Sequence, residues 1–189
     1  MKKYFTALII IFALAACVAP PLEDMNKAQD AVTRAENDAD AVMYAPNTLI
    51  RAREALTNMQ SEADAKRYDA AKNYAAEAIA NAERALVEGK AGAARVRDEA
   101  ANLINSLSGP LAETSSAVNA AKEVQNIQLD FDLLSQDMDT AERTYSDAQQ
   151  SLQANAYREA ITRAEAVRSL LSDINTRLSE AAQATSRKQ

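Results

Sequence analysis

Histidine and tryptophan are absent from the chain of 189 residues, and cysteine occurs only once. Without histidine, the chain lacks the usual general base near neutral pH and the commonest metal ligand. A single cysteine excludes internal disulfides and metal sites built from several thiolates. We therefore predict that the protein is not an enzyme, and that it has no catalytic residue, no metal site and no bound cofactor.

Glycine and proline are also scarce, with three and four copies, and aromatic residues make up 5% of the chain. A β protein with many turns needs more of both turn-forming residues. Alanine, the best helix former, is abundant instead, and this favours an all-α fold. The formal net charge of −6 disfavours nucleic-acid binding, because an acidic protein repels phosphate backbones.

The most apolar segment of the chain lies at its amino terminus, over residues 4–16, after Lys2 and Lys3. It is shorter than the roughly 20 residues that a membrane-spanning helix needs, but it suits the apolar region of a secretory signal. The segment ends in the tetrapeptide LAAC at residues 14–17, which contains the only cysteine, Cys17.

This tetrapeptide resembles the lipobox of bacterial lipoproteins. The resemblance implies that residues 1–16 are a signal peptide, which is removed, and that Cys17 carries a covalent diacylglycerol and an N-acyl lipid. Val18 stands where inner-membrane members of this family commonly have Asp, which implies an outer-membrane protein facing the periplasm. An ordinary signal peptide followed by a chance cysteine is the alternative.

The rest of the chain carries apolar residues at spacings of three and four, which is the pattern of a coiled-coil seam. One seam consists of Tyr157, Ala160, Ala164, Val167, Leu171, Ile174, Leu178 and Ala181. Similar seams run through residues 25–63, 71–107 and 117–152. They predict about four long helices, with many alanines at their contacts.

A Gly-Pro step divides these helices into two hairpins, because Gly109 suits the position after a helix and Pro110 the first position of the next. We predict an all-α, elongated, antiparallel helical bundle. Its segments are a tether over 17–23, a first hairpin over 24–107, a turn over 108–110, a second hairpin over 111–186 and a tail over 187–189. Whether the hairpins form one bundle or pack in tandem stays open.

Pro46 interrupts the first helix, since proline lacks a backbone N–H and clashes with the preceding turn. The seam nevertheless keeps its phase through residues 42, 45 and 49. A preserved phase favours one helix kinked at Pro46 over two separate helices.

The two halves of the chain align at an offset of 89 residues, so that Tyr68 falls on Tyr157. Paired tyrosines after paired turns indicate an internal repeat. The turns are expected near the segments SEADAK and QANA, with Asp64 and Asn155 as helix N-caps.

The first half joins the tripeptide YAP at residues 44–46 to an L-x-x-A pattern, a turn, Tyr68 and an A-x-x-x-A pattern. These features resemble the domain of unknown function 4398 family over roughly residues 25–88. The resemblance implies a helical periplasmic lipoprotein with no assigned activity. The turn departs from the family, with Ala65-Lys66-Arg67 where members often have Gly-Asp.

Other side chains that could carry chemistry are more simply explained by packing and solvation. Tyr68, Tyr145 and Tyr157 fall on seams and are expected to pack there rather than to contact a ligand. Two acidic stretches are interpreted as solvated helix faces rather than cation sites; they contain Glu36, Asp38, Asp40, Asp130, Asp132, Asp137 and Asp139. The methionines Met25, Met43, Met59 and Met138 are expected to fill gaps.

The leading prediction is a lipid-anchored envelope protein with a structural or interaction role, as a scaffold or adaptor. It would contact the membrane through Cys17 and bind another envelope protein, while homo-oligomerisation stays open. The alternative is a periplasmic binding module that holds an apolar or lipid ligand in the bundle. Gly89 and Gly92 mark its place, because they would bend their helix, admit a neighbouring helix or let the core open there.

Overall fold

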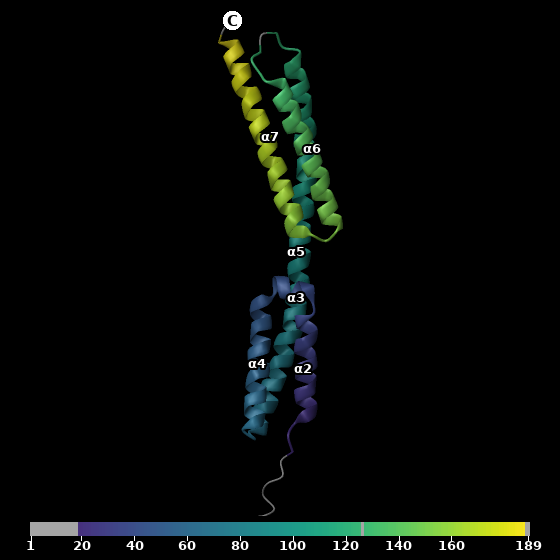
Figure 1. Ribbon diagram of the computed structural model, residues 1–189, viewed down its shortest axis with the longest axis vertical. Helices are drawn as coiled ribbons and strands as arrows, with labels where there is room; N and C mark the ends of the chain where they lie inside the picture. The colour runs from purple at the N-terminus through teal and green to yellow at the C-terminus, as the bar shows by residue number, and fades with distance from the viewer. Residues whose placement is uncertain (1–18, 126, 188–189) are drawn as a thin grey trace, which may run out of the picture. The chain divides into compact units, whose positions relative to one another are not determined.

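The computed structural model describes residues 19–125 and 127–187, all of them in helices, turns or loops (Figure 1). Within these residues there are six helices and no strand. The helices are α2 (Leu22–Glu36), α3 (Ala39–Tyr44), α4 (Pro46–Asp64), α5 (Tyr68–Lys122), α6 (Phe131–Gln153) and α7 (Tyr157–Ser186). The all-α prediction is confirmed.

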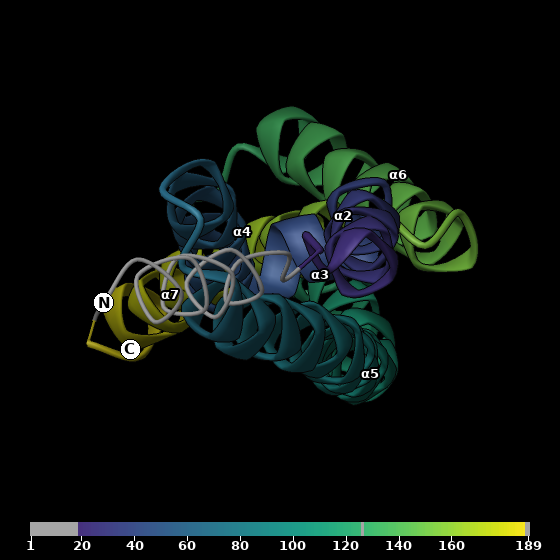
Figure 2. The same cartoon turned by 90° about the horizontal axis from the view of Figure 1, so that it is seen from below.

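The first core lies between α2, α4 and the beginning of α5. Figure 2 shows these three helices nearly end on. Most of the buried residues of this core are alanines, so the helix backbones are separated by little more than methyl groups. Its buried residues are Ala28, Ala31, Val32, Ala35, Ala41, Ala45, Leu49, Ala52, Ala55, Met59, Ala75, Ala78, Ala82 and Ala85. Met25, Leu56, Tyr74, Ile79 and Leu86 are partly buried against it.

The chain reverses between α2 and α4 instead of continuing as one helix kinked at Pro46. Asp38 caps α3, since its Oδ1 accepts a hydrogen bond of 2.8 Å from the N–H of Ala41. Pro46 is then the first residue of α4, where its missing N–H costs nothing. Arg53 of α4 reaches Glu36 at the end of α2 at 2.6 Å, a contact that a merely kinked helix could not make.

The second core lies between the later part of α5, α6 and α7. Larger side chains contribute more to it than to the first core. Its buried residues are Ala100, Ile104, Leu107, Val118, Leu134, Met138, Ala141, Ala148, Ala160, Ala164, Val167, Leu171 and Ile174. One buried polar group, Thr114, accepts a hydrogen bond of 2.8 Å from Asn175 Nδ2.

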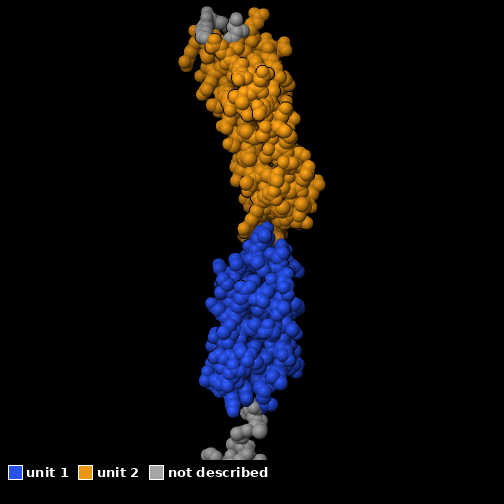
Figure 3. All heavy atoms as spheres, viewed as in Figure 1, with its two compact units in different colours: residues 1–92 blue, residues 93–189 orange. Residues whose placement is uncertain are grey.

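The two cores correspond to two compact units, which divide between Gly92 and Ala93 (Figure 3). We call residues up to Gly92 unit 1 and residues from Ala93 onward unit 2. Helix α5 belongs to both units, since it continues from Tyr68 to Lys122. Each unit thus has three main helices, and the predicted pairing into hairpins of two helices is not what the structure shows.

The turn predicted at residues 108–110 is absent, because these residues continue α5. Gly109 has no positive φ and faces open space, so it does not end the helix. Leu107 and Thr114, on either side of Pro110, are both buried in unit 2. Burial of this helix face outweighs the cost of about 3 kcal/mol that proline imposes within a helix.

The helices of the two units repeat at the predicted offset of 89 residues. Helix α4 ends at Asp64 and α6 at Gln153, while α5 begins at Tyr68 and α7 at Tyr157. Both intervening turns contain a residue with a positive φ, 60° at Lys66 and 61° at Asn155. The structure therefore supports the internal repeat.

One cross-helix contact recurs at aligned positions of the two units. In unit 1, Thr48 Oγ1 donates a hydrogen bond of 2.5 Å to Glu88 Oε2. At the aligned positions in unit 2, Asp137 Oδ2 accepts one of 2.7 Å from Arg177 Nη1. The same pair of helix positions meets in both units although the chemistry differs, which supports the repeat independently of the turns.

The two predicted N-caps are wrong. Asp64 is the last residue of α4, and its Oδ1 accepts a hydrogen bond from Gln60. Asn155 precedes Ala156, the N-cap of α7, which has no side-chain cap. Asn155 Oδ1 instead accepts a hydrogen bond of 2.7 Å from the hydroxyl of Tyr157. Asparagine is the non-glycine residue that best tolerates a left-handed turn, which explains its place there.

Candidate functional site

The predicted lipidation site, Cys17, lies outside the described residues, as does the predicted signal peptide. Helix α2 begins at Leu22, two residues earlier than the predicted hairpin. Within the described helices, none is both long and apolar enough to cross a membrane.

The acidic stretches have structural uses at four positions. Asp38 and Asp130 cap α3 and α6, and Asp130 Oδ1 accepts a hydrogen bond of 3.0 Å from the N–H of Leu133. Glu36 and Asp137 form ion pairs with arginines of neighbouring helices. Among the residues that the structure describes, no group of three or more acidic or cysteine side chains is placed to hold a metal ion.

Most of the tyrosines and methionines that were expected to pack at the seams are buried or partly buried. Tyr68, Tyr145 and Tyr157 are partly buried, as expected for packing with the hydroxyl near water. Of the methionines, Met59 and Met138 are buried and Met25 packs partly against the first core. The expectation for Met43 is wrong, because half of its surface is exposed on α3.

Gly89 and Gly92 let α3 pack directly on α5. A Cβ atom on Gly89 would lie 2.5 Å from the backbone nitrogen of Ala41, and one on Gly92 would lie 2.5 Å from Cβ of Tyr44. Of the outcomes considered for these glycines, close approach of a neighbouring helix is the one observed. Backbone atoms of Ala41 and the side chain of Tyr44 therefore fill the space directly beside these two glycines.

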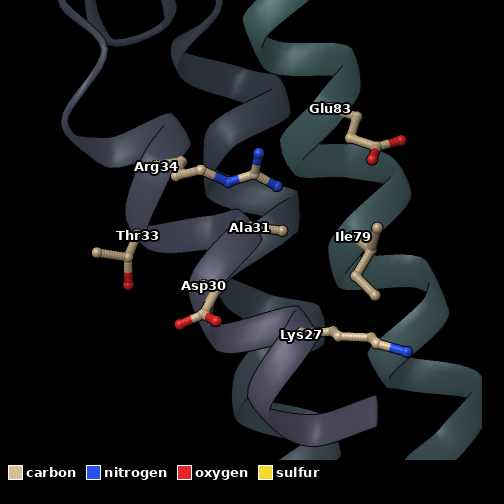
Figure 4. Close-up of a pocket in the computed structure, with 7 residues that line it drawn as sticks. All are labelled: Lys27, Asp30, Ala31, Thr33, Arg34, Ile79 and Glu83. Atoms are coloured by element: carbon tan, nitrogen blue, oxygen red, sulfur yellow. The ribbon is translucent and has the colours of Figure 1, made fainter. Parts of the chain in front are cut away.

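A groove opens on unit 1 between α2 and α5, with a volume of about 590 Å³. Figure 4 shows Lys27 and Arg34 extending from α2 toward α5, where Ile79 and Glu83 form the opposite wall. The remaining lining residues are Asp30, Ala31 and Thr33. We call this the α2–α5 groove.

The charges of the α2–α5 groove are only partly neutralised. Lys27 Nζ lies 2.6 Å from Glu23 Oε1, and the hydrogen bond to that carboxylate raises the pKa of Lys27. Arg34 and Glu83 have no hydrogen bond or ion pair with any other described residue. An open groove with an apolar floor and free charges at its rim can bind a polar or amphipathic partner without a large desolvation cost.

Sequence reasoning did not find this groove, because it forms only where α2 and α5 lie side by side. The available signal was a difference between the aligned halves. Arg34 falls on Glu123, and Ile79 falls on Arg168. The first position reverses its charge and the second replaces an apolar side chain by a cation, although both halves of the chain keep the same helical pattern.

Comparison with known families places residues 23–101 in a match to the family described as Domain of unknown function (DUF4398). The resemblance inferred from residues 25–88 is thereby confirmed, and it extends into α5 beyond Gly92. No curated protein and no solved structure matches the chain.

Proposed function

We propose that this chain, with its DUF4398 domain, is a lipid-anchored protein of the bacterial cell envelope that acts as a scaffold or adaptor. Its anchor is the diacylglycerol and N-acyl lipid on Cys17, and its place is the periplasmic side of the outer membrane. Its partner is another envelope protein. The observation that carries the interaction role is the open α2–α5 groove, because a groove between two helices is a shape that accepts a partner helix.

The short segment between Cys17 and α2 supports anchoring close to a membrane. Helix α2 begins at Leu22, and five extended residues reach at most about 18 Å. A lipid on Cys17 would therefore hold the start of α2 within that distance of the bilayer. Pro20 and Pro21 restrict this segment further, because each proline fixes its own φ.

The distribution of shifted pKa values supports a non-catalytic role. Catalytic groups acquire shifted pKa values through burial and specific partners in a cleft. Here the shifts belong to exposed ion pairs, such as Glu62, whose pKa is lowered by hydrogen bonds from Arg67. Among the described residues, the other groups with shifted pKa values are Glu23, Lys27, Arg67, Arg97 and Arg163.

The anchor is tested by labelling cells that express the full precursor with radioactive palmitate. The wild type should incorporate the label and sediment with membranes. Cys17→Ala should incorporate none, because the thiol that forms the thioether is gone, while its helical circular dichroism stays unchanged. An unlabelled wild-type protein would refute the proposed anchor.

The partner is tested by photo-crosslinking in intact cells followed by mass spectrometry. A photoreactive amino acid replaces Thr33, at the α2–α5 groove, or Thr57, which is exposed on α4. We expect one envelope protein to be captured from position 33 and not from position 57. Identical products from both positions, or none from position 33, would contradict an adaptor role for this surface.

A further inference from the structure

We infer that one end of unit 1 lies in contact with the phospholipid bilayer, with Leu22 in the interfacial region and Tyr68 at the level of the headgroups. This end consists of residues 22–27 and 62–69, and we call it the anchored end. The inference deepens the proposed membrane anchoring and rests on it. It adds a contact made by the folded helices themselves, beyond the lipid on Cys17.

The start of α2, the end of α4 and the start of α5 meet at the anchored end. The ion pair of Glu36 with Arg53 joins the end of α2 to the first half of α4. The hydrogen bond of Thr48 with Glu88 joins the beginning of α4 to a part of α5 that is far along the chain from Tyr68. Helices α2 and α5 therefore both run antiparallel to α4, which brings their first residues to the same end of unit 1 (Figure 1).

Leu22 has the exposure and the direction that a membrane contact needs. It is the first residue of α2 and is 61% exposed, whereas Met25, one turn later, packs partly against the first core. The Cα–Cβ bonds of a helix tilt toward its N-terminus. The side chains of Leu22 and of Tyr68, the first residue of α5, therefore both incline toward the anchored end. Tyrosine, with an apolar ring and a polar tip, suits a membrane interface.

The aligned end of unit 2 shows how the same leucine and tyrosine positions are used inside the protein. Leu111, which aligns with Leu22, packs partly against the second core. Tyr157, which aligns with Tyr68, donates a hydrogen bond of 2.7 Å from its hydroxyl to Asn155 Oδ1. The hydroxyl of Tyr68 has no hydrogen bond with another described residue. At the anchored end, both side chains are thus left for a contact outside the unit.

The tether makes such a small contact effective. The residues from Cys17 to the start of α2 reach at most about 18 Å when extended, so the lipid keeps Leu22 beside the membrane interface. A second contact made by a molecule that is already attached is intramolecular, and its effective concentration is high. One leucine and one tyrosine would not hold a free protein on a membrane, since even a single acyl chain binds only marginally. They are sufficient for a unit that the tether already holds there.

The anchored end is not a cationic surface, since it contains five carboxylates and three cations. Two of the cations, Lys27 and Arg67, are paired with Glu23 and Glu62. Attraction to anionic headgroups therefore does not supply the contact. The apolar surface of Leu22 supplies it instead, so a neutral bilayer should be enough.

The test uses tryptophan as a fluorescent reporter, because the chain has none of its own. Leu22→Trp places the reporter at the anchored end. Ile50→Trp places it at the other end of unit 1, at a residue that is 46% exposed near the start of α4. The proposed mature chain, which begins at Cys17, is coupled through this single thiol to a maleimide phospholipid in phosphatidylcholine vesicles, with and without brominated phosphatidylcholine.

We expect Leu22→Trp to lose about half of its emission to bromine quenching and Ile50→Trp almost none, because only a side chain in the membrane interface meets the bromine atoms. With Tyr68→Trp as the reporter, adding Leu22→Ser should reduce quenching at least about twofold, since the apolar contact is lost. Adding Ile50→Ser, the matched control, should leave the quenching of that reporter unchanged. Circular dichroism checks that all variants fold.

Equal quenching of Leu22→Trp and Ile50→Trp, or equal effects of the two serine substitutions, would overturn the inference. So would quenching of Leu22→Trp that appears only with anionic phospholipid, because the contact would then be electrostatic. Emission that shifts to the blue without quenching would also overturn it, since another protein surface would then cover Leu22. The chemical coupling does not depend on lipidation in the cell. Failure of palmitate labelling therefore refutes the anchor, whereas equal quenching refutes only the membrane contact.

Discussion

Gly89→Ala should destabilise unit 1, although alanine is the better helix former. The added Cβ would lie 2.5 Å from the nitrogen and 2.7 Å from the Cα of Ala41, and 2.7 Å from the carbonyl carbon of Asp40. All three are backbone atoms, so no side-chain rotation can relieve the contact. Helix α3 must move away from α5, and the corner between α2 and α4 moves with it.

The magnitude follows from two opposing terms. Replacing glycine by alanine within a helix stabilises it by about 1 kcal/mol. Overpacking a filled site costs about 1–3 kcal/mol, and contact with backbone places this case at the upper end. The free energy of unfolding should therefore fall by about 2 kcal/mol.

Gly109→Ala is the matched control, because Gly109 lies in the same helix with nothing within 4 Å of its added Cβ. This variant should gain about 1 kcal/mol. Urea denaturation followed by circular dichroism measures both changes, and hydrogen exchange assigns them to unit 1 or unit 2. A Gly89→Ala protein as stable as the wild type would show that α3 does not pack on α5 as described.

Three further predictions concern the turns and the second core. The pKa of Glu62 lies below 4.5 because Arg67 donates side-chain hydrogen bonds to it. The contribution of this pair to stability is therefore complete above pH 4.5. It is lost as the pH falls through the lowered pKa of Glu62. Arg67→Gln should raise the Glu62 pKa toward 4.5 in an NMR titration, and an unchanged value would contradict the pairing. Lys66→Gly should stabilise the protein in urea by about 0.5–1 kcal/mol, because φ is 60° there and a side chain is unfavourable in that region; a loss of stability would argue against this turn. Ile104→Ala should lower the free energy of unfolding by about 2–5 kcal/mol, since the side chain is fully buried, and hydrogen exchange should localise the loss to unit 2.

The helices and their buried faces could be predicted from the sequence because alanines at spacings of three and four define a face without any tertiary information. The reversal of the chain direction before Pro46 could not be predicted in this way. Ala45 and Leu49 do lie in the core, but two helices that pack antiparallel each direct a seam toward that core. An apolar seam that keeps its helical phase across Pro46 is therefore expected both for one kinked helix and for two helices joined by a reversal of the chain.

The Gly109-Pro110 step shows the opposite failure, in which a local signal was overruled by packing. Leu107 and Thr114 are buried on the same helix face, and ending the helix would have exposed them. The α2–α5 groove was out of reach for a related reason, because Lys27 and Ile79 are distant in sequence. Only the packing of α2 beside α5 brings them into one site.

The alanine-rich core of unit 1 has a consequence for how stability changes with temperature. A methyl group buries much less apolar surface than a leucine side chain does, so unfolding this unit exposes little new apolar surface per residue. The heat capacity of unfolding rises with exposed apolar area, by about 0.45 cal/mol/K for each Å². Unit 1 should therefore have a flat stability curve, whose modest free energy of unfolding persists over a wide range of temperature on either side of its maximum.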